Sequence, residues 1–571
     1  MQLLASDGWL FGLRRPDKPM IADGWCCQIY GHSILPPTQL SLCRRFKMTR
    51  FKIDCDKAME KLGKFGRYQQ IGFWLSNLVW MFFGIHIMSS AFLGGTPEFQ
   101  CQPASDYNKS LDVYSRLGKC DIYNNDTGSK LRCGTAGTSV VYDRSYGDTI
   151  VSTWNLICDR GFLSELASSA LFFGYLLGSL LIPNLADRFG RRWPLLVFLW
   201  GLTLTASLLS VSPNYVFFFV LRIVTGLFVS GAAATSWVLA CEMVVPAHRP
   251  WITLTEGLTW TVGYCMVGVV AYFLPDWRHF TLALGLPGLL TIVYIWLIPE
   301  SLYWYTAHDK QEEAKEWILD AAKCNKVDIK LDDCYSTIPE KPIEQEEKEE
   351  EEAKKSSLLD LFKCPVLLCQ TLIMAYIWMT NCFVYYGLSL YTTSLAGNRY
   401  LNYILSGVVE FPAYLLLAVS MHYLGRKTPM AVFQLVAAFS LVVLPFLPLQ
   451  TDGGASLQGL STTFWLVGKF SVTVTCMGQW LYGAELFPTT MRSSGIGFCN
   501  VVARLAAMLS PFVRLMSEVN AILPPLLFST MCLVAGLAVL ILPETHGRSL
   551  PHDLSDVDPG PLLGRFKTLK K

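Results

Sequence analysis

The stretches CEMVVPAHR at 241–249 and AELFPTTMR at 484–492 decide the fold, because the second repeats the pattern of the first. In each, a Glu precedes an Arg by seven positions, and each Glu lies 243 residues from its counterpart. Two further pairs of markers occur in the same order at nearly the same offset. They are PES at 299–301 with PET at 543–545, and ADRFGRR at 186–192 with YLGRK at 423–427. Three ordered pairs at nearly one offset predict a duplicated unit.

Each unit is predicted to hold six membrane-spanning helices. Only 16% of the residues are charged, whereas soluble proteins carry about 25%. Apolar runs of about 17–25 residues, the length that spans a bilayer, recur along the chain. They lie near 71–93, 162–182, 194–212, 215–238, 252–273, 279–298, 366–393, 401–421, 429–448, 461–483, 495–516 and 521–542. We therefore expect an all-α membrane protein of twelve helices in two pseudo-symmetric halves around a central site, the architecture of a rocking transporter.

Two long polar segments interrupt this pattern. Loop 94–161 carries glycosylation sequons at Asn108 and Asn125, which suit an extracellular face. It also holds four cysteines that suit disulfides in any of three pairings: Cys101, Cys120, Cys133 and Cys158. The second segment contains the acidic run 344–352 and is predicted to be a solvated linker. The expected organisation is an N-terminal segment 1–70, a half 71–298, a linker 299–364, a half 365–542 and a tail 543–571.

Basic residues in the short loops predict the orientation of the helices. Even-to-odd connections hold Arg188, Arg191, Arg192, Arg249, Arg426, Lys427 and Arg492. The opposite short loops hold mainly Arg278, Arg399 and Arg514. The first set is expected to face the cytoplasm, so both termini are predicted to be cytoplasmic and loop 94–161 extracellular.

The charged markers at the cytoplasmic helix ends are candidate gating residues. Such charges can pair across helices when the cytoplasmic side is closed and exchange partners when it opens. The candidates are Asp187, Arg191, Glu242 and Arg249 in the first half, and Arg426, Glu485 and Arg492 in the second. The alternative is that these charges only anchor helix ends at the membrane interface.

At these markers the sequence resembles a known family. ADRFGRR is similar to the loop signature of major facilitator transporters, with Asn184 where that pattern usually has Gly. STWNLICDR (152–160), PDWR (275–278), PES, AELFPTTMR and LPETHG (542–547) resemble signatures of the organic cation, organic anion and carnitine transporters of solute carrier family 22. The resemblance covers about 50–550 and implies a plasma-membrane carrier of small charged organic molecules. Residues 301–305 depart from it, because the Pro-Arg usual after PES is missing.

Ionisable residues within membrane spans are costly, so each one is a functional candidate. The candidates are Arg222, Glu410, Lys469 and Arg504. Arg222 lies close to a helix end and is either functional or structural. Lys469 either touches substrate or pairs internally, and internal pairing is favoured. Glu410 matches an acidic position found in family members that carry cations.

Arg504 carries the most information about substrate charge. The resemblance implies that cation-specific members of the family have an acidic residue at this position, whereas carnitine-type and anion-type members have Arg. The Arg guanidinium offers a fork that matches a carboxylate. Aromatic side chains hold quaternary ammonium groups by cation–π contact, and the candidates are Tyr264, Trp378, Tyr385 and Tyr386. The rival interpretation of Arg504 is a permanent internal salt bridge, for instance to Glu410.

The leading functional prediction is alternating-access transport of a carnitine-like zwitterion or organic cation, with an organic anion as the alternative. A transport-inactive scaffold or a receptor is the alternative of a different class. We find no nucleophile–base pair, phosphate loop or metal-ligand spacing, so we expect no enzyme activity, cofactor or metal. The expected partners are a small organic ion, the lipid bilayer and, as an open point, sodium or a proton. The net charge of +2 argues against nucleic acid.

Overall fold

The structure is a computed structural model that describes residues 50–103, 114–116, 120–124, 130–134, 138–144, 147–338, 364–447, 457–551 and 556–560. The chain divides into two compact units. One comprises 1–52 and 335–350, and its described part contains β7 (Tyr335–Ile338) paired with β1 (Arg50–Ile53), of which residues 50–52 belong to this unit. The other comprises 53–334 and 351–571 and holds the long helices.

The first half of the helical unit follows the predicted spans closely. Its helices are α4 (Arg67–Met88) with α5 (Ser90–Leu93), α7 (Phe162–Phe189), α8 (Arg192–Leu209), α9 (Tyr215–Glu242) and α10 (Pro250–Phe273). The sixth span is broken into α11 (Trp277–Gly285), the 3₁₀ turn η4 (Leu286–Val293) and α12 (Tyr294–Leu297). Pro287 accounts for the break, since it removes a backbone N–H from the helix ladder.

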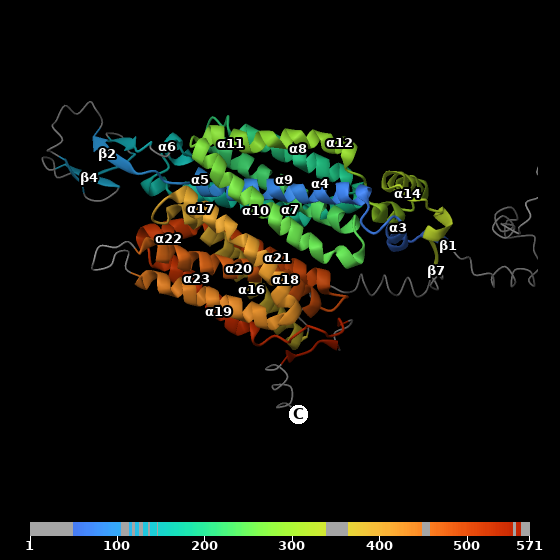
Figure 1. The fold of residues 1–571 in the computed structure, drawn as a ribbon. Coiled ribbons are helices and arrows are strands. Elements are labelled where there is room, and N and C mark those ends of the chain that lie inside the picture. The colour runs from blue at the N-terminus through green and yellow to red at the C-terminus, as the bar shows by residue number, and fades with distance from the viewer. Residues whose placement is uncertain are drawn as a thin grey trace, which may run out of the picture. The chain divides into compact units, whose positions relative to one another are not determined.

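The second half repeats this order. Its helices are α16 (Pro365–Tyr391), α17 (Arg399–Val408), α18 (Glu410–Tyr423), α19 (Lys427–Val443), α20 (Gln458–Leu486), α21 (Arg492–Leu509), α22 (Val513–Val519) and α23 (Leu523–Val539). Here α17 with α18 forms one span, and α21 with α22 forms another, joined by η9 (Ser510–Phe512). In Figure 1 the helices of the first half lie beside those of the second, roughly parallel to one another.

The prediction of twelve spanning helices is confirmed. Ten helical segments of the described chain are long and apolar enough to cross a bilayer. Two more complete the set in the second half. α23 is apolar but has 17 residues, and α20 has 29 residues but carries many polar side chains, Lys469 among them. Several of the polar side chains of α20 are buried and face the interior of the bundle.

The outer surface of the bundle is apolar, as a protein embedded in lipid requires. The broken sixth span is strongly apolar, and its side chains Leu289, Leu290 and Trp296 are largely exposed. Exposed contiguous apolar surface of this kind is unusual in soluble monomers. It indicates that these side chains face acyl chains.

We call the end of the bundle that bears residues 94–161 the loop end; it lies at the left in Figure 1. Strand β2 (Phe99–Pro103) pairs with β6 (Thr138–Tyr142), and β3 (Tyr114–Arg116), β4 (Asp121–Asn124) and β5 (Lys130–Arg132) form a second antiparallel sheet. Disulfides join Cys101 to Cys133 and Cys120 to Cys158, which selects one of the three predicted pairings. Asn108 and Asn125 lie outside the described residues.

The motif STWNLICDR holds this loop against the bundle. Its first three residues complete α6 (Ile150–Trp154), whose N-cap Thr149 makes a capping box with Ser152. The indole N–H of Trp277, in the PDWR motif, donates to Thr153 Oγ1 at 2.9 Å, and the ring of Trp154 packs on that of Trp277. Two separate signatures in the sequence therefore form one contact.

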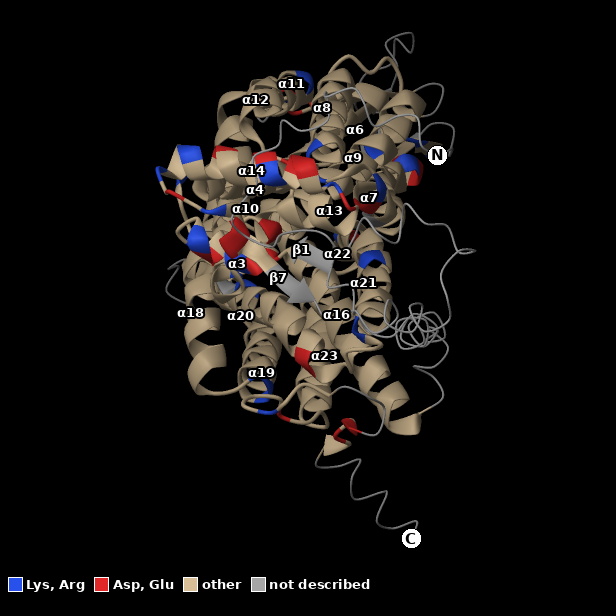
Figure 2. Ribbon diagram, turned by 90° about the vertical axis from the view of Figure 1, so that its right-hand side faces the viewer, with Lys and Arg blue, Asp and Glu red and all other residues tan. Residues whose placement is uncertain are grey.

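We call the opposite end the linker end. It carries α3 (Cys55–Lys61), α13 (Leu302–Ala307) and α14 (Gln311–Asn325). Figure 2 looks onto this end, where Lys, Arg, Asp and Glu gather over α3, α13 and α14. Residues 301–305, which depart from the family pattern after PES, lie at this end. The indole N–H of Trp304 donates a hydrogen bond to the Asp187 carbonyl at 2.8 Å.

Candidate functional site

A buried ion pair lies at the centre of the second half. Lys469 Nζ lies 2.9 Å from Glu410 Oε1, and both side chains are 0% exposed. The helix break at Val409 places Glu410 at the first position of α18, just before Pro412. Tyr385 donates a hydrogen bond to Glu410 Oε1 at 2.7 Å, and the ammonium lies 3.2 Å from the centroid of the Tyr385 ring. The carboxylate is therefore committed to internal partners.

Further contacts join this pair to the first half of the bundle. On α10, the Trp260 indole donates to the Tyr385 hydroxyl at 2.9 Å, and Thr261 Oγ1 lies 3.4 Å from Glu410 Oε2. The hydroxyl of Tyr264, also on α10, lies 3.2 Å from Ser406 Oγ of α17. The polar layer thus spans the interface between the halves, where a rocking transporter binds its substrate.

Arg504 lies on α21 at the same interface but has different neighbours. Its guanidinium carbon lies 4.2 Å from the ring centroid of Tyr175, which belongs to α7 of the first half. Tyr386 and the thiols of Cys382 and Cys476 lie close enough to interact with its charge. Among the described residues no carboxylate pairs with it, and its Nε has no hydrogen-bond partner. The suggested bridge to Glu410 is not formed, because Glu410 binds Lys469.

The other predicted site residues make further packing contacts and hydrogen bonds. Trp378 is buried against Trp480 of α20, with ring centroids 4.4 Å apart. Tyr386 packs edge-on against Phe172 of α7. Arg222 is 2% exposed, bonds Ser90 Oγ and the carbonyl of Ala167, and so ties α9 to α5 and α7.

At the linker end of the first half, three of the four predicted gating residues meet. Arg191 lies 2.9 Å from Asp187 and 3.2 Å from Glu242, so it joins α7 to α9. Glu300 of the PES motif accepts from the backbone N–H groups of Arg191 at 2.7 Å and Ser301 at 2.9 Å. Arg249 stands apart and donates to the Tyr303 hydroxyl at 3.4 Å.

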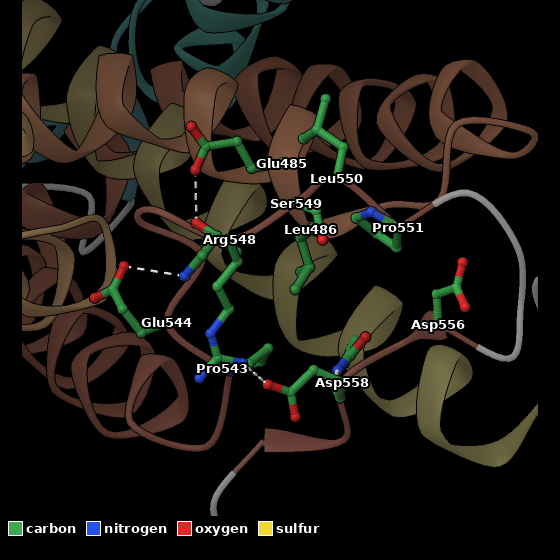
Figure 3. A pocket seen from close by; sticks show the side chains of 12 residues that line it. Glu485, Leu486, Pro543, Glu544, Arg548, Ser549, Leu550, Pro551, Asp556 and Asp558 are labelled. Atoms are coloured by element: carbon green, nitrogen blue, oxygen red, sulfur yellow. Dashed lines mark hydrogen bonds and ion pairs between the residues drawn. The ribbon is translucent and has the colours of Figure 1, made fainter.

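The second half repeats this cluster with one addition. Arg426 pairs with Glu485 at 2.8 Å, and Thr545 donates to the same carboxylate at 2.7 Å. Beyond it, described residues of the tail line a cavity of about 320 Å³, where Arg548 and Asp558 form an ion pair (Figure 3). Arg492, the counterpart of Arg249, makes no ion pair among the described residues.

The two PE motifs differ in electrostatics although they occupy equivalent places. Burial raises the pKa of Glu300 above its ordinary value despite the N–H groups that it accepts from. Burial also acts to raise the pKa of Glu544, but it is outweighed by backbone N–H donors, the largest contribution coming from Arg426, so the net shift is downward. The carboxylate of the second half is therefore the better stabilised anion.

Two charged residues outside the predicted site, Arg514 and Glu165, form an ion pair at the loop end. Arg514, read as a loop residue, lies in α22 and pairs with Glu165 of α7 at 3.3 Å. Its guanidinium also donates to the carbonyls of Gly94 and Leu390 at 3.0 Å each. These partners come from both halves, so this cluster fastens the halves together. By contrast, the ion pairs described at the linker end each lie within one half.

Comparisons with known proteins agree with this geometry. A family model described as "Sugar (and other) transporter" matches residues 119–552. The chain is 32% identical to an organic cation transporter protein of Drosophila melanogaster, over 88% of this chain and 94% of that one. It is 30% identical to solute carrier family 22 member 3 of Rattus norvegicus, over 88% and 95%. The chain belongs to solute carrier family 22, within the sugar (and other) transporters.

The fold of this solute carrier is shared with more distant transporters. An inward-open structure of the xylose transporter XylE from E. coli superposes with a TM-score of 0.55 at 17% identity, covering 84% of this chain and 97% of that one. This likeness establishes the major facilitator fold. The chain is thus a multi-pass membrane transporter for small organic substrates, and its relatives are transporters, not enzymes.

Replacing Arg191 with Ala should reduce transport by this solute carrier about tenfold, with less effect on surface level. The pair with the exposed Asp187 contributes little, so the loss is about that of one charged hydrogen bond, at the low end of about 1.5–3 kcal/mol, which corresponds to about tenfold. Uptake normalised to surface biotinylation measures the effect, and Arg188→Ala, which removes an exposed neighbour, is the matched control. Normal uptake with unchanged cysteine accessibility at both ends would exclude a gating role.

Proposed function

We propose that this transporter carries a small organic ion with a carboxylate, a carnitine-like zwitterion first and an organic anion second. The observation that carries the proposal is Arg504, a cation at the interface of the halves that pairs with no carboxylate in the described chain. A guanidinium held in a low-dielectric site needs a negative partner or water. A substrate carboxylate supplies a planar, two-point partner.

The charge balance of the central layer supports the same substrate class. Glu410 and Lys469 neutralise each other, which leaves Arg504 as the net charge of this layer. The role proposed for Glu410 is to pair with Lys469, because its oxygens already accept a hydrogen bond from Tyr385 and lie near Thr261. A purely cationic substrate would meet repulsion from Arg504, because the described carboxylate of this layer, Glu410, is already paired with Lys469.

A zwitterion also agrees with the names of the relatives, several of which are called organic cation transporters. Its ammonium group would lie against aromatic rings, and Tyr175 and Tyr386 are the rings beside Arg504. A small anion would use Arg504 alone. Competition between the two ligand types for one labelled substrate distinguishes these cases.

We also propose that the protein lies in the plasma membrane with the loop end outside and both termini in the cytoplasm. The disulfides of loop 94–161 suit an oxidising compartment, and the basic residues of the linker end follow the positive-inside rule. Glycosidase treatment should shift the gel mobility of wild type but not of the Asn108→Gln/Asn125→Gln variant. An identical mobility for wild type with and without glycosidase would contradict glycosylation of this loop.

Uptake of labelled carnitine by cells making the protein tests the proposal and separates a carrier from a scaffold or receptor. We expect saturable uptake above that of control cells and of cells making Arg191→Ala at matched surface level. Binding of the substrate without uptake would favour a receptor or scaffold. Repeating the measurement with and without sodium tests for sodium coupling.

A further inference from the structure

Glu256 is a buried carboxyl group without a stabilising partner. It lies near the linker end of α10, seven residues into that helix, and is 2% exposed. Neither of its side-chain oxygens has a hydrogen-bond partner among the described residues, and no Lys, Arg or His there forms an ion pair with it. Of the other buried carboxylates in the described chain, Glu165 and Glu410 each pair with a cation, and Glu300 accepts hydrogen bonds from backbone N–H groups.

The surroundings of Glu256 oppose a negative charge. An isolated ionised carboxylate in a low-dielectric interior is strongly destabilised, and such a group takes up a proton unless a cation reaches it. The Trp80 indole on α4 faces the group but makes no full hydrogen bond to it. The titratable group that interacts with it is the Cys241 thiol on α9. From α18, Tyr414 packs against Gly257, and its hydroxyl is directed to Glu410.

These neighbours favour a proton over a metal cation as the ligand. Hard cations such as sodium require several oxygen ligands, whereas an indole N–H presents a hydrogen atom to the site. The described residues contain no cluster of metal-binding side chains at this position. A proton needs one carboxyl oxygen only.

We propose that Glu256 is the proton-binding residue of a proton-coupled transport cycle, a proposal that rests on the transport function proposed above. In the packed arrangement the carboxyl is neutral. When the halves rock, the contact between Gly257 and Tyr414 of the other half changes, and water reaches the neighbouring carboxyl. The O–H bond then breaks and the proton passes to water on that side; the carboxylate takes up its next proton from water only after the halves have rocked back and the site has opened to the opposite side of the membrane.

The test uses the full-length protein in liposomes, with a pH gradient imposed across the membrane. Wild type should accumulate labelled carnitine against the carnitine concentration gradient when the pH gradient has the direction that drives coupled transport. Glu256→Gln, neutral at every pH, should lose this accumulation while retaining substrate exchange between the two sides. Glu316→Gln on α14, which removes an exposed carboxylate, should behave like wild type.

Each outcome decides the proposal. Full gradient-driven accumulation by Glu256→Gln, or accumulation by wild type driven by sodium alone, would overturn it. If the Gln variant does not fold, Glu256→Asp keeps a titratable group and should retain coupling with a displaced pH profile; an unchanged profile would overturn the proposal. Absence of any substrate exchange by wild type would instead refute the proposed substrate class, so the two failures are distinguishable.

Discussion

Replacing Arg504 with Ala should reduce the apparent affinity for carboxylate-bearing substrates about 10- to 100-fold at near-normal surface level. The guanidinium lies beside Tyr175 at the interface of the halves and pairs with no carboxylate in the described chain. Losing a charged two-point contact of about 1.5–3 kcal/mol corresponds to that range. Initial uptake rates over a series of substrate concentrations measure it.

Two companion variants separate substrate binding from a structural role of Arg504. Arg504→Lys keeps the charge but loses the planar fork, and is expected to have intermediate affinity. Arg504→Asp should lose carboxylate uptake and retain or gain uptake of simple cations. Unchanged carboxylate uptake in Arg504→Ala would contradict the proposed role, and loss of folded protein in all three variants would assign Arg504 to structure.

Replacing Lys469 with Ala should destabilise the protein by about 3–5 kcal/mol, because the buried Glu410 carboxylate loses its cation. The remaining donors, the hydroxyls of Tyr385, Thr261 and Tyr414, do not neutralise the charge. Thermal unfolding of detergent-purified protein and surface level in cells measure the loss. Transport should fall together with the amount of folded protein.

The double variant Glu410→Gln/Lys469→Met is the matched control for this prediction. It removes both charges and keeps similar volumes, so it should recover much of the stability lost in Lys469→Ala. If Lys469→Ala unfolds at the temperature of wild type, the pair does not stabilise the fold. If the double variant is as unstable as the single one, the loss arises from packing and not from an unpaired charge.

Much of the fold could be predicted from the sequence because membrane spans depend on local composition. The predicted span 162–182 lies within α7. The stretch 241–249 and its repeat at 484–492 both lie at helix ends at the same end of the bundle. Boundaries shifted by a few residues, since helices such as α7 continue beyond the apolar core into the polar marker ADRFGRR.

The pairing of charges could not be predicted, because it depends on contacts between distant segments. Glu410 and Arg504 are both intramembrane charges, yet Glu410 binds Lys469 on a third helix. The repeat also predicted equal roles for Arg249 and Arg492, whereas Arg249 contacts Tyr303 of α13 and Arg492 makes no ion pair among the described residues. Local pattern does not encode such neighbours.

The charges that the sequence analysis passed over lie near helix ends. Glu165 is the fourth residue of α7 and Glu256 the seventh of α10, where a carboxylate in sequence looks solvated. Arg514 follows the break at Pro511 and was read as a loop residue. Counting every charge inside a 20-residue window, and not only those near its centre, would have selected all three.

Uptake by purified protein in liposomes, compared among carnitine, a small quaternary amine without a carboxylate and an aromatic carboxylate, tests the central claim most directly. The charge of Arg504 predicts that carnitine is carried best, the aromatic carboxylate second and the quaternary amine least. Transport of the quaternary amine as fast as carnitine, unaffected by Arg504→Ala, would contradict the account.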